Sequence, residues 1–268
     1  MSDLDTRVRG DRIMRIALPV LALALGVGIW QAIVTLNNIP PYILPSPLLV
    51  AQTAIADWPI LWSSLLITLQ TTFEGLLLAL IGGIGLAILF NMSRWIENSF
   101  YPYAVILQVT PVLAIAPILL IYLPQPLAVL ACAWIVAFFP VLANTTLGLN
   151  SVDHNLRDLF RLCGATRTQV LFQLKLPAAL PYMLEGLKIG GGLSLVGAVV
   201  AELAAGAAGA GSGLAYRISE AGYRLNIPRM FAALLLLSIA GIVIFFSLSL
   251  FSHLMLRRWH ESAIERES

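Results

Sequence analysis

The chain has 268 residues, of which 59% are hydrophobic and 11% are charged, and its net charge is +2. Soluble domains carry about 25% charged residues, so this composition indicates an integral membrane protein. The scattered Lys and Arg residues form no basic patch, which argues against a nucleic-acid partner. Two isolated cysteines, Cys132 and Cys163, provide neither a disulfide framework nor a metal site.

Six apolar runs are long enough to cross a bilayer, whose hydrocarbon core needs about 20 helical residues. They predict an all-α, polytopic membrane protein with a membrane domain at residues 16–256. A basic segment, residues 1–15, precedes it and a polar tail, residues 257–268, follows it. We interpret the first run as an uncleaved span rather than a signal peptide. The expected spans are residues 16–36, 62–90, 103–123, 127–149, 189–208 and 231–256.

The connections and the spans carry several local signals. A Pro-rich connection at residues 37–59 contains a short amphipathic piece that ends near Asp57. In the second run, the glycines at 82, 83 and 85 are small enough to let another helix approach closely. The third run contains Pro111 and Pro117, which predict a kink that either lines a pathway or serves packing alone. A Gly-rich, mildly polar connection at residues 209–229 precedes the last run.

The distribution of basic residues predicts the orientation of the chain. With six spans, both termini lie on the same side of the membrane. If that side is the cytoplasm, 13 of the 16 Lys and Arg residues are cytoplasmic. The other three, Arg217, Arg224 and Arg229, lie together in one outer connection. Because cytoplasmic loops are enriched in Lys and Arg, we expect both termini and the 153–188 loop to be cytoplasmic.

The 153–188 loop is the longest charged segment of the chain, and its pattern predicts two short helices. Asp153 can cap the first helix, and Gly164 stands where a left-handed C-terminal cap is needed. Thr166 and Gln169 have the spacing of a capping box at the start of the second helix. Pro177 is expected to end or kink that helix. Such a loop is either a docking surface for a soluble partner or an amphipathic segment on the lipid headgroups.

The spacing of this loop resembles the cytoplasmic signature of bacterial ABC importer permeases, in which an acid, a glycine, an aliphatic residue and a Leu-Pro pair recur at fixed distances. Where that family usually has Glu-Ala-Ala, this chain has Asp158, Leu159 and Phe160, so two small residues are replaced by bulky ones. The Leu-Pro-Ser-Pro segment at residues 44–47 further resembles permeases for nitrate, sulfonate, taurine and pyrimidine precursors. The residues that the resemblance assigns to ATPase coupling are Asp158, Leu159, Phe160, Gly164, Ala165, Leu174, Leu176 and Pro177.

The resemblance implies a type I importer-like fold and a defined set of partners. Two copies of the permease would form the pathway in the bacterial inner membrane, in contact with its lipid. Two ATPase subunits would dock on the 153–188 loops, and a periplasmic binding protein would deliver the substrate. The sequence contains no P-loop, so ATP and magnesium are expected on the partner subunit.

No catalytic constellation is present, and the three histidines are isolated near the ends of spans. We therefore expect conduction rather than chemistry. Acidic residues inside a span are costly and by default indicate function, which singles out Glu202 and Glu74. Their alternative role is a structural hydrogen bond to a neighbouring helix. The other candidates for the pathway or gate are the polar residues Gln108, Thr110 and Asn144.

Two other classes of protein fit the composition. A secondary transporter driven by an ion gradient should show internal repeats with interrupted spans in matching halves. No convincing repeat is present, although the Pro-containing third run fits that class. A membrane anchor that only recruits a soluble partner does not need polar groups inside several spans, and this chain has them.

Overall fold

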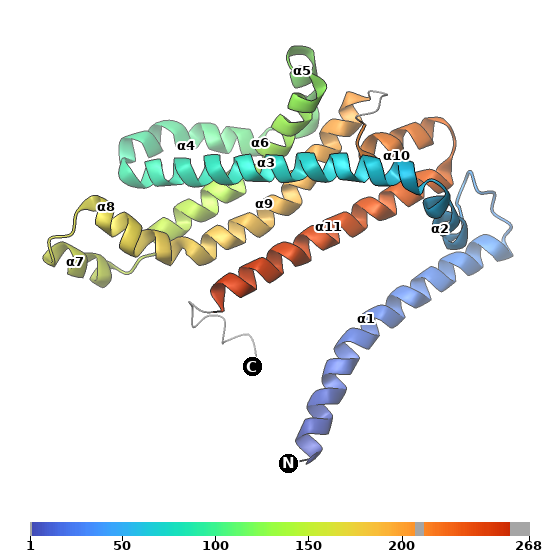
Figure 1. Ribbon diagram of the computed structural model, residues 1–268, viewed down its shortest axis with the longest axis horizontal. Coiled ribbons are helices and arrows are strands. Elements are labelled where there is room, and N and C mark those ends of the chain that lie inside the picture. The colour runs from blue at the N-terminus through green and yellow to red at the C-terminus, as the bar shows by residue number, and fades with distance from the viewer. Residues whose placement is uncertain (1, 207–211, 258–268) are drawn as a thin grey trace.

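The computed structural model describes residues 2–206 and 212–257, and every regular element in this part of the chain is a helix (Figure 1). The predicted all-α class is therefore confirmed. The predicted tail lies outside the described residues except for Arg257. The helices are α1 (Ser2–Leu36), α2 (Pro47–Ala56), α3 (Trp58–Met92), α4 (Arg94–Val109), α5 (Val112–Tyr122), α6 (Gln125–Asn150), α7 (His154–Leu162), α8 (Arg167–Val170), η1 (Leu171–Lys175), α9 (Leu176–Ala205), α10 (Leu214–Tyr223) and α11 (Ile227–Leu256).

Five helical stretches within the described residues are long and apolar enough to cross a membrane. They correspond to the predicted first, second, fourth, fifth and sixth spans. The fifth differs in its bounds, because its helical stretch already begins at Arg167, within the predicted loop, and residues 207–208 of the prediction lie outside the described residues. The third run departs from the prediction, because α4 and α5 meet at an angle of 100° rather than forming one kinked helix over 103–123. The break lies at Thr110 and Pro111, and Pro117 stays inside α5. If the bent pair counts as one span, the described residues contain six.

The core of the molecule is formed where α3, α6 and α9 pack together through small residues. A Cβ atom added to Gly83 would lie 2.9 Å from Val141 of α6. One added to Gly197 of α9 would lie 2.7 Å from the carbonyl oxygen of Cys132 in α6. The predicted close approach is thus confirmed at Gly83, whereas Gly85 faces open space. Such glycines let helices pack at short distance where lipid offers no hydrophobic driving force.

Helix α1 stands apart from this core (Figure 1). Only 6% of the apolar window within Ala17–Leu36 is buried. Its contacts with the rest of the chain lie near its C-terminal end. The ring of Trp30 lies 5.8 Å from that of Phe231 in α11, and the Leu48 N–H donates to the Gln31 side chain of α1. Helix α2 matches the predicted short piece before Asp57 and is capped by Ser46.

The two ends of the molecule differ in character (Figure 1). At one end, which we call the loop end, α7 and α8 project beyond the spans. At the other, which we call the α10 end, α2 and α10 lie beside the first turns of α3 and α11. Helix α10 occupies part of the connection predicted at 209–229. The prediction that Pro177 ends the second loop helix is wrong, because α8, η1 and α9 form one continuous stretch from Arg167 to Ala205 with a π-helical turn just before Pro177.

Candidate functional site

Helix α7 is closed at both ends by the residues that the sequence indicates. The Asn155 N–H donates to Asp153 Oδ1 at 2.8 Å, which caps the N-terminus. At the C-terminus, the Ala165 N–H donates to the Phe160 carbonyl and the Gly164 N–H donates to the Arg161 carbonyl, both at 3.0 Å. These two bonds form a Schellman motif, in which Gly164 takes a left-handed φ of +73°.

The second loop helix begins with the predicted capping box. The Gln169 N–H donates to Thr166 Oγ1 at 3.3 Å, and the Thr166 N–H donates back to Gln169 Oε1 at 2.7 Å. The turn between α7 and α8 is therefore fixed by local hydrogen bonds at both ends, although its residues are largely exposed. A docking element needs this combination of defined shape and free surface.

The surface of α7 presents an apolar ridge beside a charged pair. Three leucines spaced three residues apart are exposed, and we call Leu156, Leu159 and Leu162 the leucine ridge. Beside it, Asp158 Oδ1 lies 3.3 Å from the Arg161 guanidinium, and both side chains are solvent-exposed. Phe160 is half-buried, as is Ala165. The family-like pattern did not single out Leu156 or Leu162, which are recognisable by their helical spacing.

The loop is joined firmly to the spans at its far end. Leu171 is buried in the core that contains Phe90 of α3 and Leu149 of α6. Lys175 Nζ donates to Asn91 Oδ1 at 2.8 Å, and Asn91 Nδ2 donates to Asn150 Oδ1 at 3.2 Å. These bonds connect the π-helical turn η1, which leads directly into α9, to α3 and α6. We call Lys175, Asn91 and Asn150 the polar tether.

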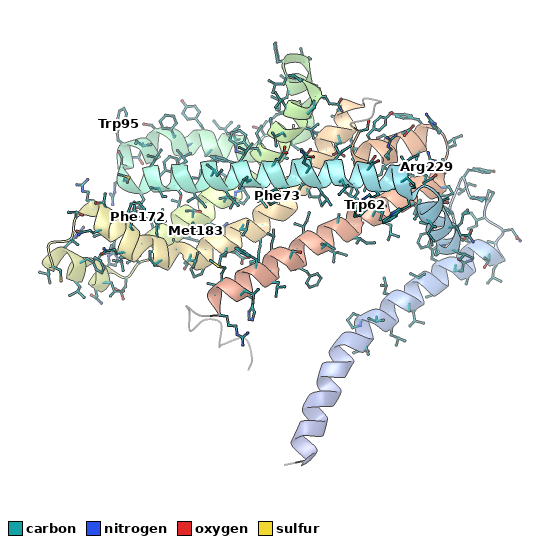
Figure 2. The ribbon with its side chains drawn as sticks, in the orientation of Figure 1. Trp62, Phe73, Trp95, Phe172, Met183 and Arg229 are labelled. Atoms are coloured by element: carbon teal, nitrogen blue, oxygen red, sulfur yellow. The ribbon has the colours of Figure 1, made fainter. Side chains whose placement is uncertain are left out.

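The side chains around this junction are distributed over its surface and interior. Three residues of the resembling motif are half-buried here: Leu174 in η1, and Leu176 and Pro177 at the start of α9. Phe172 is exposed and lies at the loop end of the molecule, with Met183 further along α9 (Figure 2). The junction is thus packed in its interior, whereas Phe172 is exposed on its surface.

The acidic candidate Glu202 lies far from this loop, near the α10 end of α9. Its side chain is only 5% exposed. Thr68 Oγ1 of α3 lies 2.8 and 3.0 Å from its two carboxylate oxygens, and the Ala215 N–H of α10 donates to it at 3.1 Å. The geometry is that of a buried hydrogen-bonded junction between three helices.

Two further polar links join helices at this end of the molecule. Arg229 of α11 lies at the α10 end of the molecule (Figure 2). It makes a bidentate pair with Asp57, with N···O distances of 2.6 and 2.9 Å. Arg217 of α10 donates to Ser64 of α3 at 3.0 Å and to Glu220 at 2.8 Å. The hydrogen bond from Arg217 is the main cause that lowers the pKa of Glu220 below its ordinary value.

The other pathway candidates occupy separate places. Glu74 is exposed on α3 and accepts from Gln70 one turn away, at 2.9 Å. Gln108 is exposed near the end of α4, and Thr110 lies at the α4–α5 break, bonded to its own helix. Asn144 donates to the Pro140 carbonyl of α6. Among the described residues, no hydrogen bond joins any two of these side chains or joins one to Glu202.

Ligand groups for a metal do not gather in the described part of the chain. No three His, Cys, Asp or Glu side chains lie close enough together there to hold an ion. What the structure offers is a set of apolar spans, a well-defined projecting loop and a buried polar junction. Together these define a helical membrane protein with one projecting loop.

The sequence identifies the family. The model of the binding-protein-dependent transport system inner membrane component matches residues 75–261, so the chain belongs to that family. It is therefore the permease component of an ABC importer, a transport component rather than a catalytic enzyme. The membership implies ATPase and binding-protein partners.

Similar proteins agree with this assignment. A probable ABC transporter permease protein from Haemophilus influenzae is 34% identical, over 90% of this chain and 97% of its own. The formylaminopyrimidine transport permease protein ThiX from Halalkalibacterium halodurans is 31% identical, over 89% of this chain and 94% of its own. A solved amino acid ABC transporter with histidines shares the fold, with a TM-score of 0.62 at 20% identity, over 75% of this chain and 96% of its own.

Proposed function

We propose that two copies of this chain form the translocation pathway of an ATP-driven importer, and that each copy docks one ATPase subunit on its 153–188 loop. The observation that carries the proposal is the construction of this loop. Its outer side presents the leucine ridge, while its inner side is held to three spans by Leu171 and the polar tether. A partner that moves the ridge would therefore move α3, α6 and α9 as well.

The arrangement in the membrane follows from the distribution of basic residues. The protein lies in the bacterial inner membrane, surrounded by lipid, with both termini and the loop end in the cytoplasm. The α10 end then faces the periplasm, where a substrate-binding protein delivers its cargo. This orientation places the leucine ridge where ATP is available.

Transport on this proposal is a change in population between inward-facing and outward-facing states. ATP and magnesium are held by the partner subunit, and their binding closes the ATPase pair. The docked loops swing with it, and the continuous stretch from Arg167 to Ala205 carries the movement into the bilayer. This chain contributes positions and polar contacts but breaks no covalent bond.

We propose that the substrate is a small solute from the group of sulfonates, nitrate, taurine, pyrimidines and aromatic acids. Within this group we propose the pyrimidine type. The relative ThiX, a formylaminopyrimidine transport permease protein, supports the pyrimidine class. The resemblance to importer permeases implies an Arg before the Pro-rich stretch of the third span, whereas this chain has Gln108, Val109 and Thr110. The absence of that cation at this position favours a substrate that is less anionic.

The docking proposal is tested by co-purifying the chain with the ATPase encoded beside it. Leu159→Asp places a charge in the centre of the leucine ridge and should abolish the complex. Leu225→Asp is a matched control, because Leu225 is also exposed and its left-handed φ of +55° suits Asp. Retention of the ATPase by Leu159→Asp, or its equal loss in both variants, would refute docking through the ridge.

A further inference from the structure

A row of buried polar groups runs along the face of α3 toward its α10 end. Ser64, Thr68 and Thr72 are spaced four residues apart and are 1%, 0% and 2% exposed. The spacing places them on one face of the helix. Each reaches a different partner: Ser64 accepts from Arg217, Thr68 contacts Glu202 and α10, and the Thr72 carbonyl accepts from Ser194 at 2.8 Å.

Thr68, at the centre of this row, helps to cap the N-terminus of α10. Helix α10 has Gly213 at its N-cap, which offers no side-chain acceptor. Its first amides find their acceptors on other helices instead. The Leu214 N–H donates to Thr68 Oγ1 at 2.8 Å, and the Ala215 N–H donates to Glu202 at 3.1 Å. Thr68 and Glu202 are bonded to each other, so α3, α9 and α10 meet in one network, which we call the trans-cap.

Gly213 allows the close approach on which the trans-cap depends. A Cβ atom added there would lie 2.0 Å from Glu202 Oε1, far inside any tolerated contact. The φ of Gly213 is −73°, so the glycine is required by space rather than by backbone conformation. The carboxylate therefore occupies the volume that a side chain at this position would take.

A local cap would satisfy the same amides at less cost. Ser, Asp or Asn at the N-cap position stabilises a helix start through its own side chain. This chain instead uses residues 13 and 146 positions away in the sequence, one of them an acid in a span. What the long-range arrangement adds is a connection: α10, and with it the start of α11, is fixed to the ends of α3 and α9.

We propose that Thr68 and Glu202 are positioning residues for transport, whose trans-cap holds α10 in place while the α10 end of the pathway is closed and releases it when that end opens. The proposal rests on the proposed importer function. Hydrogen bonds suit such a latch, because water can replace them when the junction opens and their net contribution is modest. The latch also has two discrete arrangements, docked and released.

The experiment uses the complete complex of permease, ATPase and binding protein in lipid nanodiscs and vesicles. Thr68→Val removes the bridging hydroxyl at nearly constant shape, and Thr68→Ser restores it. Thr72→Val is the matched control, since Thr72 is equally buried on the same face and its hydroxyl bonds only to its own helix, at the Thr68 carbonyl. Hydrogen exchange of residues 212–224, ATP hydrolysis without binding protein, and substrate moved per ATP are measured together.

Thr68→Val should speed exchange at the start of α10 about tenfold, as expected when buried hydrogen-bonding groups lose their partner. Hydrolysis without binding protein should rise about fivefold, and substrate moved per ATP should fall by a similar factor. Thr68→Ser and Thr72→Val should resemble the unmodified protein. Gly213→Ala should displace the Glu202 carboxylate and so reproduce the effects of Thr68→Val. It takes the place of Thr68→Val if that variant does not reach the membrane.

Two results would overturn the latch. Faster exchange with unchanged transport per ATP would make the trans-cap merely structural, and unchanged exchange would show that it does not hold α10. Both results differ from the one expected if the proposed importer function is wrong. If it is wrong, the unmodified complex itself would not assemble or would not transport substrate on ATP.

Discussion

Gly164 is the residue at which backbone conformation and docking are most closely connected. Its φ of +73° lies in the left-handed region, and an added Cβ would meet nothing within 4 Å. The cost of a side chain there is therefore purely conformational, about 1 kcal/mol. The turn that sets the angle between α7 and α8 depends on this one position.

Gly164→Ala should accordingly weaken binding of the ATPase about fivefold, the equivalent of that conformational cost. The thermal stability of the spans should not change, because the loop projects beyond them. Titration of the nanodisc-embedded protein with the ATPase subunit measures the effect. Gly85→Ala is the control, since Gly85 also faces open space but lies within helix α3 with no positive φ. Equal affinity of the two variants would contradict the role of the turn.

Local chemistry explains which residue-scale features the sequence could predict. Asp153, Gly164 and the Thr166–Gln169 box act within a few residues of themselves, so their spacing was sufficient. Glu202 could be singled out as a costly acid but not placed. Its partner Thr68 is 134 residues away, and only the packing of α3 against α9 brings them together. The sequence could not indicate Gly213 for the same reason, because this glycine is required by the nearby Glu202 side chain rather than by a turn.

At the scale of elements, the π-helical turn η1 joins the loop to the membrane domain. Proline in a helix interior clashes with the carbonyl four residues earlier, which for Pro177 is that of Gln173 inside η1. The wider π turn accommodates the ring, so the helix continues through Pro177 instead of ending there. The polar tether lies at the same turn, where Lys175 reaches Asn91.

Lys175→Met should therefore separate ATP hydrolysis from transport. It retains the length and apolar body of the side chain but removes the bond to Asn91, so only the packing of Leu171 would still connect the loop to α3 and α6. Substrate moved per ATP should fall about fivefold while ATPase binding persists. Lys188→Met is the control, because Lys188 pairs with Glu185 within its own helix. A fall in binding and transport together would indicate loss of the loop itself.

Helix packing between α6 and α9 gives a second prediction at this scale. Gly197→Leu places a side chain against the backbone carbonyl of Cys132, which cannot move aside without shifting α6. Such overpacking costs about 1–3 kcal/mol. Thermal unfolding in nanodiscs should show a clear loss of stability for this variant. Gly192→Leu, at an open position on the same helix, should change it little, and similar losses in both would disprove the packing argument.

The third predicted span shows where sequence patterns stop being informative. Both Pro111 and Pro117 could break a helix, and the sequence gives no reason to choose between them. In the structure Thr110 is extended, as residues before proline tend to be, and the chain turns there. Ala116 is fully buried in a cluster with Ala133 of α6 and Ala198 of α9, so packing keeps α5 helical through Pro117.

At the scale of the whole molecule, the native cysteines report the proposed orientation. Cys163 is exposed at the start of the turn between α7 and α8, whereas Cys132 is buried in α6. A membrane-impermeant maleimide should therefore label Cys163 in inside-out vesicles and leave it unmodified in intact spheroplasts. Cys163→Ala should abolish labelling. Modification of Cys163 from the outside would reverse the orientation and remove the loop from the ATPase compartment.

The central claim is that ATP hydrolysis on a docked partner drives this permease. The most direct measurement is substrate uptake into vesicles that contain the chain, with the adjacent ATPase and binding protein added or omitted. We predict uptake only with all three components and ATP, and none from an ion gradient alone. Uptake by the chain by itself, driven by an imposed ion gradient, would contradict the account and identify a secondary transporter.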